Sequence, residues 1–128
     1  MIRNTPKSKL ELLPAGIIHN TYEEGSLIDK QEAVNIISTV YEMIGEGRLL
    51  LLNDLRTKVT FNRDARNHFR DNTPPDAAVA FVINSKIGEV AVNFFLKFNA
   101  PHYNLRIFNE LDEATKWLEQ EGKRPAST

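Results

Sequence analysis

The chain has 128 residues, a length typical of one domain, so we expect no multidomain enzyme. Its 16 basic and 17 acidic side chains give a formal net charge of -1, so no overall field attracts nucleic acid or an anionic membrane. It contains no cysteine, which excludes disulfides, thiolate metal ligands and thiol nucleophiles.

The N-terminal third predicts a β-hairpin and then a helix. Two extended runs, residues 9–13 and 17–22, flank Pro14-Ala15-Gly16, where proline and glycine favour a turn. Asp29 has the position of a helix N-cap, with Glu32 three residues later as in a capping box. Apolar residues then recur at helical spacing, and two glycines mark the end of the helix: Ala33, Val34, Ile37, Val40, Tyr41, Ile44, Gly45 and Gly47.

Two uninterrupted apolar runs in the middle of the chain predict strands that are covered on both faces. They occupy residues 49–52 and 77–83, and such runs are typical of the parallel part of a sheet. Between them, Asn62 is placed to cap a short helix that points Ala65 and Phe69 inward.

The last third predicts a helix, a strand and a second helix. Ser85 is placed to cap a helix with an apolar core-facing stripe, which consists of Ile87, Val90, Ala91, Phe94, Phe95 and Phe98. Residues 105–108 form the last predicted strand, and Asn109 is placed to cap the last helix. That helix is expected to bury four residues and to end at a glycine: Leu111, Ala114, Trp117, Leu118 and Gly122.

The order of elements predicts an α/β fold with a single-layer mixed sheet, in which an N-terminal β-hairpin precedes βαβ crossovers and the helices pack on the sheet. One domain is expected over residues 9–122, between a flexible N-terminus at 1–8 and a disordered tail at 123–128. No signal-peptide segment and no apolar run of membrane-spanning length is present in the sequence. We therefore expect a cytoplasmic protein.

Four strings in the chain resemble a known family. They are LLLLNDLR at 49–56, RDAR at 63–66, AVAFVINSKIGEVAVNFFLKFNAP at 78–101 and RIFNELDEATKWL at 106–118. With the order of elements, these strings resemble the STAS fold of anti-sigma-factor antagonists, and specifically its uncharacterised bacterial SpoIIAA-like branch. The resemblance implies a domain that regulates or binds a protein partner.

The resemblance also directs attention to the stretch after the strand at 49–52. In partner-switching STAS proteins, a serine or threonine at the start of the following helix is phosphorylated. Here the stretch 54–62 contains no Asp-Ser-Ser string, and its only hydroxyl side chains are those of Thr57 and Thr60. We therefore expect neither threonine to be an obligatory switch.

Polar residues follow the parallel strands at their carboxyl ends, where open α/β sheets place ligands. The candidate ligand or regulatory crevice consists of Asp54, Arg56, Thr57, Asn84, Ser85 and Lys86, with Asn53 and Asn109 beside it. The alternative interpretation is that several of these residues cap helices or form loops. For Asp54, a structural role is favoured over phosphoryl transfer, because no further carboxylates converge on it to hold Mg²⁺.

The remaining polar residues form no recognisable catalytic or metal pattern. His19, His68 and His102 are scattered without metal-ligand spacing, so we expect no metal site and no cofactor. The basic residues Arg63, Arg66 and Arg70 alternate with acidic ones, which favours a solvated helix face over a nucleic-acid surface. We expect no enzymatic activity, since no nucleophile with a neighbouring base stands out.

A second line of residues on the predicted Ser85 helix consists of Gly88, Val92 and Leu96, four residues apart and beside the core face. We interpret this line as a candidate interface with a partner or a second copy, the alternative being partial cover by a neighbouring loop. The sequence as a whole predicts a non-enzymatic STAS-like domain for protein interaction or regulation, self-association included. The alternative function is small-ligand or lipid binding at the carboxyl-end crevice.

Overall fold

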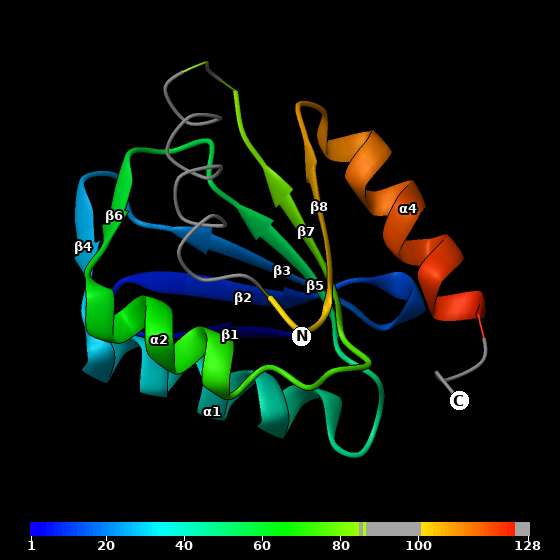
Figure 1. Cartoon of the computed structure of the whole chain (residues 1–128), viewed down its shortest axis with the longest axis horizontal. Coiled ribbons are helices and arrows are strands. Elements are labelled where there is room, and N and C mark those ends of the chain that lie inside the picture. The colour runs from blue at the N-terminus through cyan, green and yellow to red at the C-terminus, as the bar shows by residue number, and fades with distance from the viewer. Residues whose placement is uncertain (85, 87–100, 125–128) are drawn as a thin grey trace.

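A computed structural model of the chain describes residues 1–84, 86 and 101–124. Within them, six strands form one mixed sheet in the order β1-β2-β3-β5-β7-β8, and two further strands form a small parallel ribbon (Figure 1). The sheet consists of β1 (Ile2–Asn4), β2 (Ser8–Leu12), β3 (Ile17–Tyr22), β5 (Leu50–Asp54), β7 (Ala78–Val82) and β8 (Asn104–Phe108). The ribbon consists of β4 (Ser26–Ile28) and β6 (Val59–Phe61), and the helices are α1 (Lys30–Ile44), α2 (Arg63–Asp71) and α4 (Leu111–Lys123).

The predicted β-hairpin is confirmed. β2 and β3 pair antiparallel and are joined by a 3-10 turn at Pro14–Gly16. Ala15 and Gly16 both have positive φ in this turn, at 69° and 77°, and the glycine adopts this conformation without steric cost. The Leu13 amide donates to the Ile17 carbonyl at 2.7 Å and closes the turn.

The first residues differ from the flexible N-terminus expected at 1–8. β1 pairs antiparallel with β2, and the Leu12 amide donates to the Met1 carbonyl at 2.9 Å. A strand of three residues is too short to show an alternating pattern in the sequence. β1 forms through its pairing with β2 rather than through a local preference of its residues. The same reason explains why β4 and β6 were not predicted.

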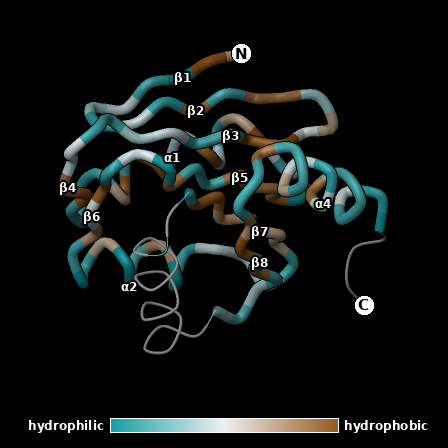
Figure 2. Tube along the Cα trace, turned by 90° about the horizontal axis from the view of Figure 1, so that it is seen from above, coloured by the Kyte–Doolittle hydropathy of each residue, from teal (hydrophilic) through white to brown (hydrophobic). Residues whose placement is uncertain are grey.

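The parallel part of the sheet also agrees with the sequence. β3, β5, β7 and β8 are mutually parallel neighbours, and all five residues of β7 are buried. One face of the sheet packs against α1 and α2, and the other packs against α4 (Figures 1 and 2). The continuous apolar runs predicted this arrangement correctly, because only strands covered on both sides tolerate them.

α1 begins at the predicted N-cap, but two of its residues differ from expectation. The Asp29 carboxylate accepts from the Glu32 amide at 2.9 Å, and Gly45 ends the helix with φ 59°. Tyr41 was expected on the apolar stripe but is 40% exposed, whereas Ile36, which was not assigned to the stripe, is buried. The capping box is also incomplete, because the Glu32 carboxylate faces away from Asp29 and accepts from Lys7.

α2 is capped as predicted, whereas both ends of α4 differ. The Asn62 side chain accepts from the Ala65 amide at 2.9 Å. α4 has Glu110 at its N-cap position, so the prediction of Asn109 was wrong. Gly122 lies inside α4 rather than after it, and its lack of a side chain admits Leu50, whose side chain would lie 2.9 Å from a Cβ at this position. The helix continues to Lys123, where a disordered tail was expected, and residues 125–128 lie outside the described part.

Candidate functional site

Two polar clusters lie at the carboxyl edge of the sheet, where β3 and β5 end side by side. Alternation along the strands places them on opposite faces. His19 and Asp54 lie on the face that carries α4, and they form the first cluster together with Arg56. Asn20, Tyr22 and Asn53 lie on the face that carries α1 and α2, and they form the second; the strand register sets Asn20 beside Asn53.

The first cluster is centred on the carboxylate of Asp54, whose side chain is 6% exposed. Arg56 binds it at two points, from Nε to Oδ1 at 2.9 Å and from Nη2 to Oδ2 at 2.7 Å. The Arg56 amide donates to Oδ1 at 3.2 Å. His19 Nε2 lies 3.0 Å from Oδ2 and donates, since an ionised carboxylate only accepts. Four contacts therefore hold Asp54 in one orientation.

These contacts determine the charge of Asp54. Burial alone would raise the pKa of its carboxyl group, but the hydrogen bonds from Arg56 and His19 outweigh burial and lower the pKa below its usual value. Asp54 is therefore ionised at neutral pH and paired with a guanidinium. A carboxylate in this state is a poor proton acceptor and a firm anchor for the loop that follows β5.

The second cluster is buried. Asn20 Nδ2 donates to the Tyr22 hydroxyl at 2.8 Å, and this hydroxyl donates to Asn53 Oδ1 at 2.8 Å. Burial raises the pKa of Tyr22 far above its usual value, so the phenol stays neutral and donates. Asn20 Oδ1 has no hydrogen-bond partner among the described residues. The cluster joins β3 to β5. The ring of Phe61 packs edge-on against the ring of Tyr22, with 5.3 Å between the two ring centroids.

The structure brings together only part of the crevice predicted from the sequence. Asp54 and Arg56 are in contact, and the exposed Thr57 donates its hydroxyl to the Tyr22 carbonyl at 3.3 Å. Asn84 and Lys86 are exposed beyond the end of β7, and no hydrogen bond in the described part of the chain joins them to Asp54. Ser85 and the candidate interface residues Gly88, Val92 and Leu96 lie outside the described residues, as does the predicted stripe at 87–98.

Three residues of these clusters were missed as site candidates: His19, Asn20 and Tyr22. In the sequence, Asn20 and Tyr22 look like ordinary strand residues, and His19 is a histidine without metal-ligand spacing. The available signal was their polarity within a strand of a sheet that was expected to be covered by helices. A buried polar side chain needs a partner, so each of them pointed to a neighbour on the next strand.

Among the described helices, α4 covers only part of the width of the sheet face on which it lies. α4 packs mainly against β5, β7 and β8, with smaller contacts to β3 and the hairpin turn. The register from β1 to β3 places six side chains on this face beyond α4: Ile2, Asn4, Lys9, Glu11, His19 and Thr21. We call these six residues the open half-face. Figure 2 shows their strands at the edge of the sheet away from β8.

The open half-face is charged and uneven in exposure. Lys9, Asn4 and Ile2 are exposed, whereas Glu11, His19 and Thr21 are partly buried. Ile2 is 54% exposed and adds apolar area to this surface. The polar side chains reach the surface in two rows across the strands: Glu11 stands beside His19, and Lys9 beside Thr21.

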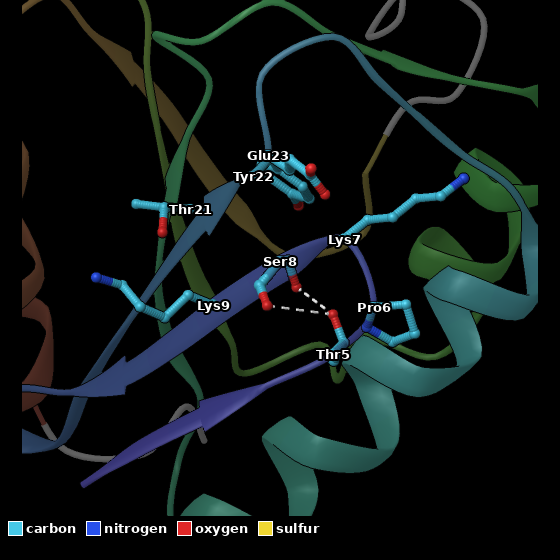
Figure 3. A pocket seen from close by; sticks show the side chains of 8 residues that line it. All are labelled: Thr5, Pro6, Lys7, Ser8, Lys9, Thr21, Tyr22 and Glu23. Carbon is cyan, nitrogen blue, oxygen red and sulfur yellow. Dashed lines mark hydrogen bonds between the residues drawn. The ribbon is translucent and has the colours of Figure 1, made fainter.

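A shallow, open depression of about 260 Å³ adjoins the same edge (Figure 3). Its lining consists of Thr5, Pro6, Lys7, Ser8, Lys9, Thr21, Tyr22 and Glu23. Several of its polar groups already have partners. The Thr5 hydroxyl lies 2.7 Å from the Ser8 hydroxyl and donates to the buried Glu32 at 2.6 Å, and Lys7 Nζ donates to the Leu27 carbonyl at 2.8 Å.

No group of three or more histidine or acidic side chains is arranged to hold a metal ion in residues 1–84, 86 and 101–124. None of the helices in that part has the length and apolar composition of a membrane span.

Comparison with known proteins gives a family but no activity. A family model described as "Domain of unknown function (DUF7793)" matches residues 11–121. A solved structure of a protein with unknown function from Arthrobacter sp. FB24 is 27% identical in sequence, with 91% of this chain and 95% of that chain covered and a TM-score of 0.35. No curated protein matches the chain.

Proposed function

Because the chain belongs to the DUF7793 family of domains of unknown function, we propose a function from the geometry of its own surface. The protein is a non-enzymatic binding domain that engages a protein partner through the open half-face. The observation that carries this proposal is the partial cover of the sheet by the described helices, of which α4 packs over β5, β7 and β8 and leaves the strands β1 and β2 beyond it.

The chemistry of the surface supports binding of a protein. The open half-face combines both charge signs with the exposed Ile2, and mixed polarity of this kind is common in non-obligate protein interfaces. The Asp54 cluster next to it is rigid, because Arg56 and His19 hold the carboxylate from two sides. A rigid surface loses little conformational entropy on association. The STAS-like strings of the sequence suggest the same role.

Site-specific photo-crosslinking in cells that produce the protein tests this proposal. A benzophenone side chain at Lys9 is expected to form crosslinks to protein, whereas the same group at Ser38, which is exposed on α1, is the control. The additional change Glu11→Lys is expected to weaken the crosslink at Lys9. Equal crosslinking at Lys9 and Ser38, or none at Lys9, would contradict the proposal.

Small-ligand or lipid binding is the second candidate, favoured by the depression in Figure 3. Its lining includes Lys9 and Thr21, which are neighbours across β2 and β3, and a pairing of amine and hydroxyl suits a small anion. If this candidate is right, inorganic phosphate raises the thermal midpoint of the protein and Lys9→Ala removes the effect. No shift at millimolar phosphate would eliminate anion binding in the depression.

A further inference from the structure

We propose that the partner of the open half-face is a second copy of this chain, and that each copy inserts its α4 over the open half-face of the other. This inference rests on the proposed function and names the partner. In the resulting two-fold dimer, the axis runs parallel to the strands. The two α4 helices then lie side by side in one layer between two sheets.

The partial cover by α4 limits the ways in which two copies can pack face to face. A helix with its side chains is about 10 Å thick, so α4 stands above the sheet and leaves a step of that height beside it. If two copies pack face to face about an axis that runs across the strands, their α4 helices collide. An axis parallel to the strands exchanges the two halves of the face, and each α4 then fills the step in the other copy.

The contacts between α4 and β8 determine the position of α4 along the strands. Asn104 at the start of β8 donates to Glu121 at 2.7 Å, and the guanidinium of Arg106 lies 5.7 Å from the centre of the Trp117 ring. α4 therefore runs antiparallel to β8, with Lys116 level with Arg106. Asp112 lies about 6 Å further toward the carboxyl edge, at about 1.5 Å per helical residue.

The same levels recur on the open half-face. The strand register connects Arg106 to Glu11 through one row across the sheet, which consists of Ala80, Leu52 and His19. Lys9 lies two strand residues closer to the carboxyl edge than Glu11, a step of about 6.6 Å. Rotation about an axis parallel to the strands leaves these levels unchanged. It therefore brings Asp112 to Lys9 of the other copy, and Lys116 to Glu11 of the other copy.

The charges on the outer side of α4 complement those on the open half-face. The side of α4 that faces away from its own sheet carries four exposed side chains of alternating charge: Asp112, Lys116, Glu119 and Lys123. The first two meet charges of opposite sign on the open half-face. Since the axis is two-fold, each pair forms twice in the dimer. An interface of this polarity predicts reversible association that weakens as the salt concentration rises.

A charge-swap series measured by sedimentation equilibrium tests the dimer. The full chain is compared with Lys9→Glu, Asp112→Lys and the double variant Lys9→Glu/Asp112→Lys. Each single variant places like charges together twice per dimer and is expected to weaken association about tenfold or more. The double variant restores opposite charges and is expected to recover most of the affinity.

Lys30→Glu is the matched control, because Lys30 is exposed at the start of α1 on the other face of the sheet and its replacement changes the net charge as Lys9→Glu does. It is expected to leave association unchanged, and circular dichroism verifies that every variant is folded. A wild-type chain that stays monomeric at millimolar concentration overturns the dimer, and so does a double variant no tighter than the single ones. In either case, crosslinks from Lys9 to another protein leave the proposed function intact.

Discussion

Asp54 shows how one residue can be both buried and charged. Its carboxylate is removed from water, which costs free energy. This cost is offset by hydrogen bonds to Oδ2 from Arg56 Nη2 at 2.7 Å and from His19 Nε2 at 3.0 Å. The sequence indicated a structural role for Asp54 at the end of an apolar strand. These contacts attach the start of the loop after β5 to the end of the strand.

The first prediction concerns Asp54→Asn. The pKa of Asp54 is lowered in the folded protein, so its ionised form stabilises the fold above the unfolded pKa of about 4, and this contribution is lost as the pH falls through the folded value. We expect Asp54→Asn to reduce the free energy of unfolding by about 1 to 3 kcal/mol at pH 7. The difference from wild type should narrow at pH 3, as measured by urea unfolding.

Glu46→Gln provides the control for this prediction, because Glu46 is exposed in the loop after α1 and undergoes the same change from carboxylate to amide. It should leave the unfolding midpoint unchanged at both pH values. A gap between Asp54→Asn and wild type that is equal at pH 7 and pH 3 would show that the ionised carboxylate contributes nothing.

The sequence predicts one partner of Asp54 but not the other. Arg56 is two residues away, so the sequence placed it in the same crevice. His19 lies 35 positions away and meets Asp54 only because β3 pairs with β5 in a particular register. A register is determined by the packing of whole strands, and no local pattern around His19 encodes it.

At the scale of elements, the buried Glu32 connects two segments that the sequence treated separately. The Thr5 hydroxyl donates to its carboxylate at 2.6 Å, and the Lys7 amide donates to the same oxygen at 2.8 Å. These bonds attach the turn between β1 and β2 to the first turn of α1. A carboxylate is also favoured at this place by the helix dipole.

The second prediction is that Glu32→Ala releases this turn without unfolding the domain. The Lys7 amide loses its acceptor, so its hydrogen exchange should accelerate at least tenfold, and the Thr5 amide should follow because its bond to Ser8 depends on the same turn. Exchange in β7 should not change. Gln31→Ala is the control, since Gln31 is the exposed neighbour of Glu32 on α1. Unchanged protection of Lys7 in Glu32→Ala would contradict the attachment.

The elements that could be predicted are those with local signals. Asp29 and Asn62 cap α1 and α2 as expected, and the apolar runs at β5 and β7 gave the covered strands. β1, β4 and β6 have three residues each and form only through pairing with distant segments. Gly122 was misinterpreted because a glycine that stops a helix and a glycine that admits a close neighbour look the same in sequence.

At the scale of the whole molecule, one sheet separates two apolar clusters. The cluster beneath α1 and α2 includes Ile36 and Val40, and the cluster beneath α4 includes Trp117 and Leu118. The central strand β5 contributes to both, because its residues alternate between the faces: Leu52 is buried against α4, and Leu51 packs toward α1. We therefore expect the two clusters to form and break together.

The last prediction tests this coupling with Ile36→Ala. Ile36 is 1% exposed, and its truncation should reduce the free energy of unfolding by about 2 to 5 kcal/mol. Trp117 is the only tryptophan and reports on the opposite face, so its fluorescence should follow a urea transition that shifts to lower concentration together with the far-UV circular dichroism. If Ile36→Ala does not fold, Ile36→Val should show the same coincidence with a loss of about 0.5 to 1.5 kcal/mol. A fluorescence midpoint that stays at its wild-type value while the circular dichroism midpoint falls would show that the two faces unfold independently.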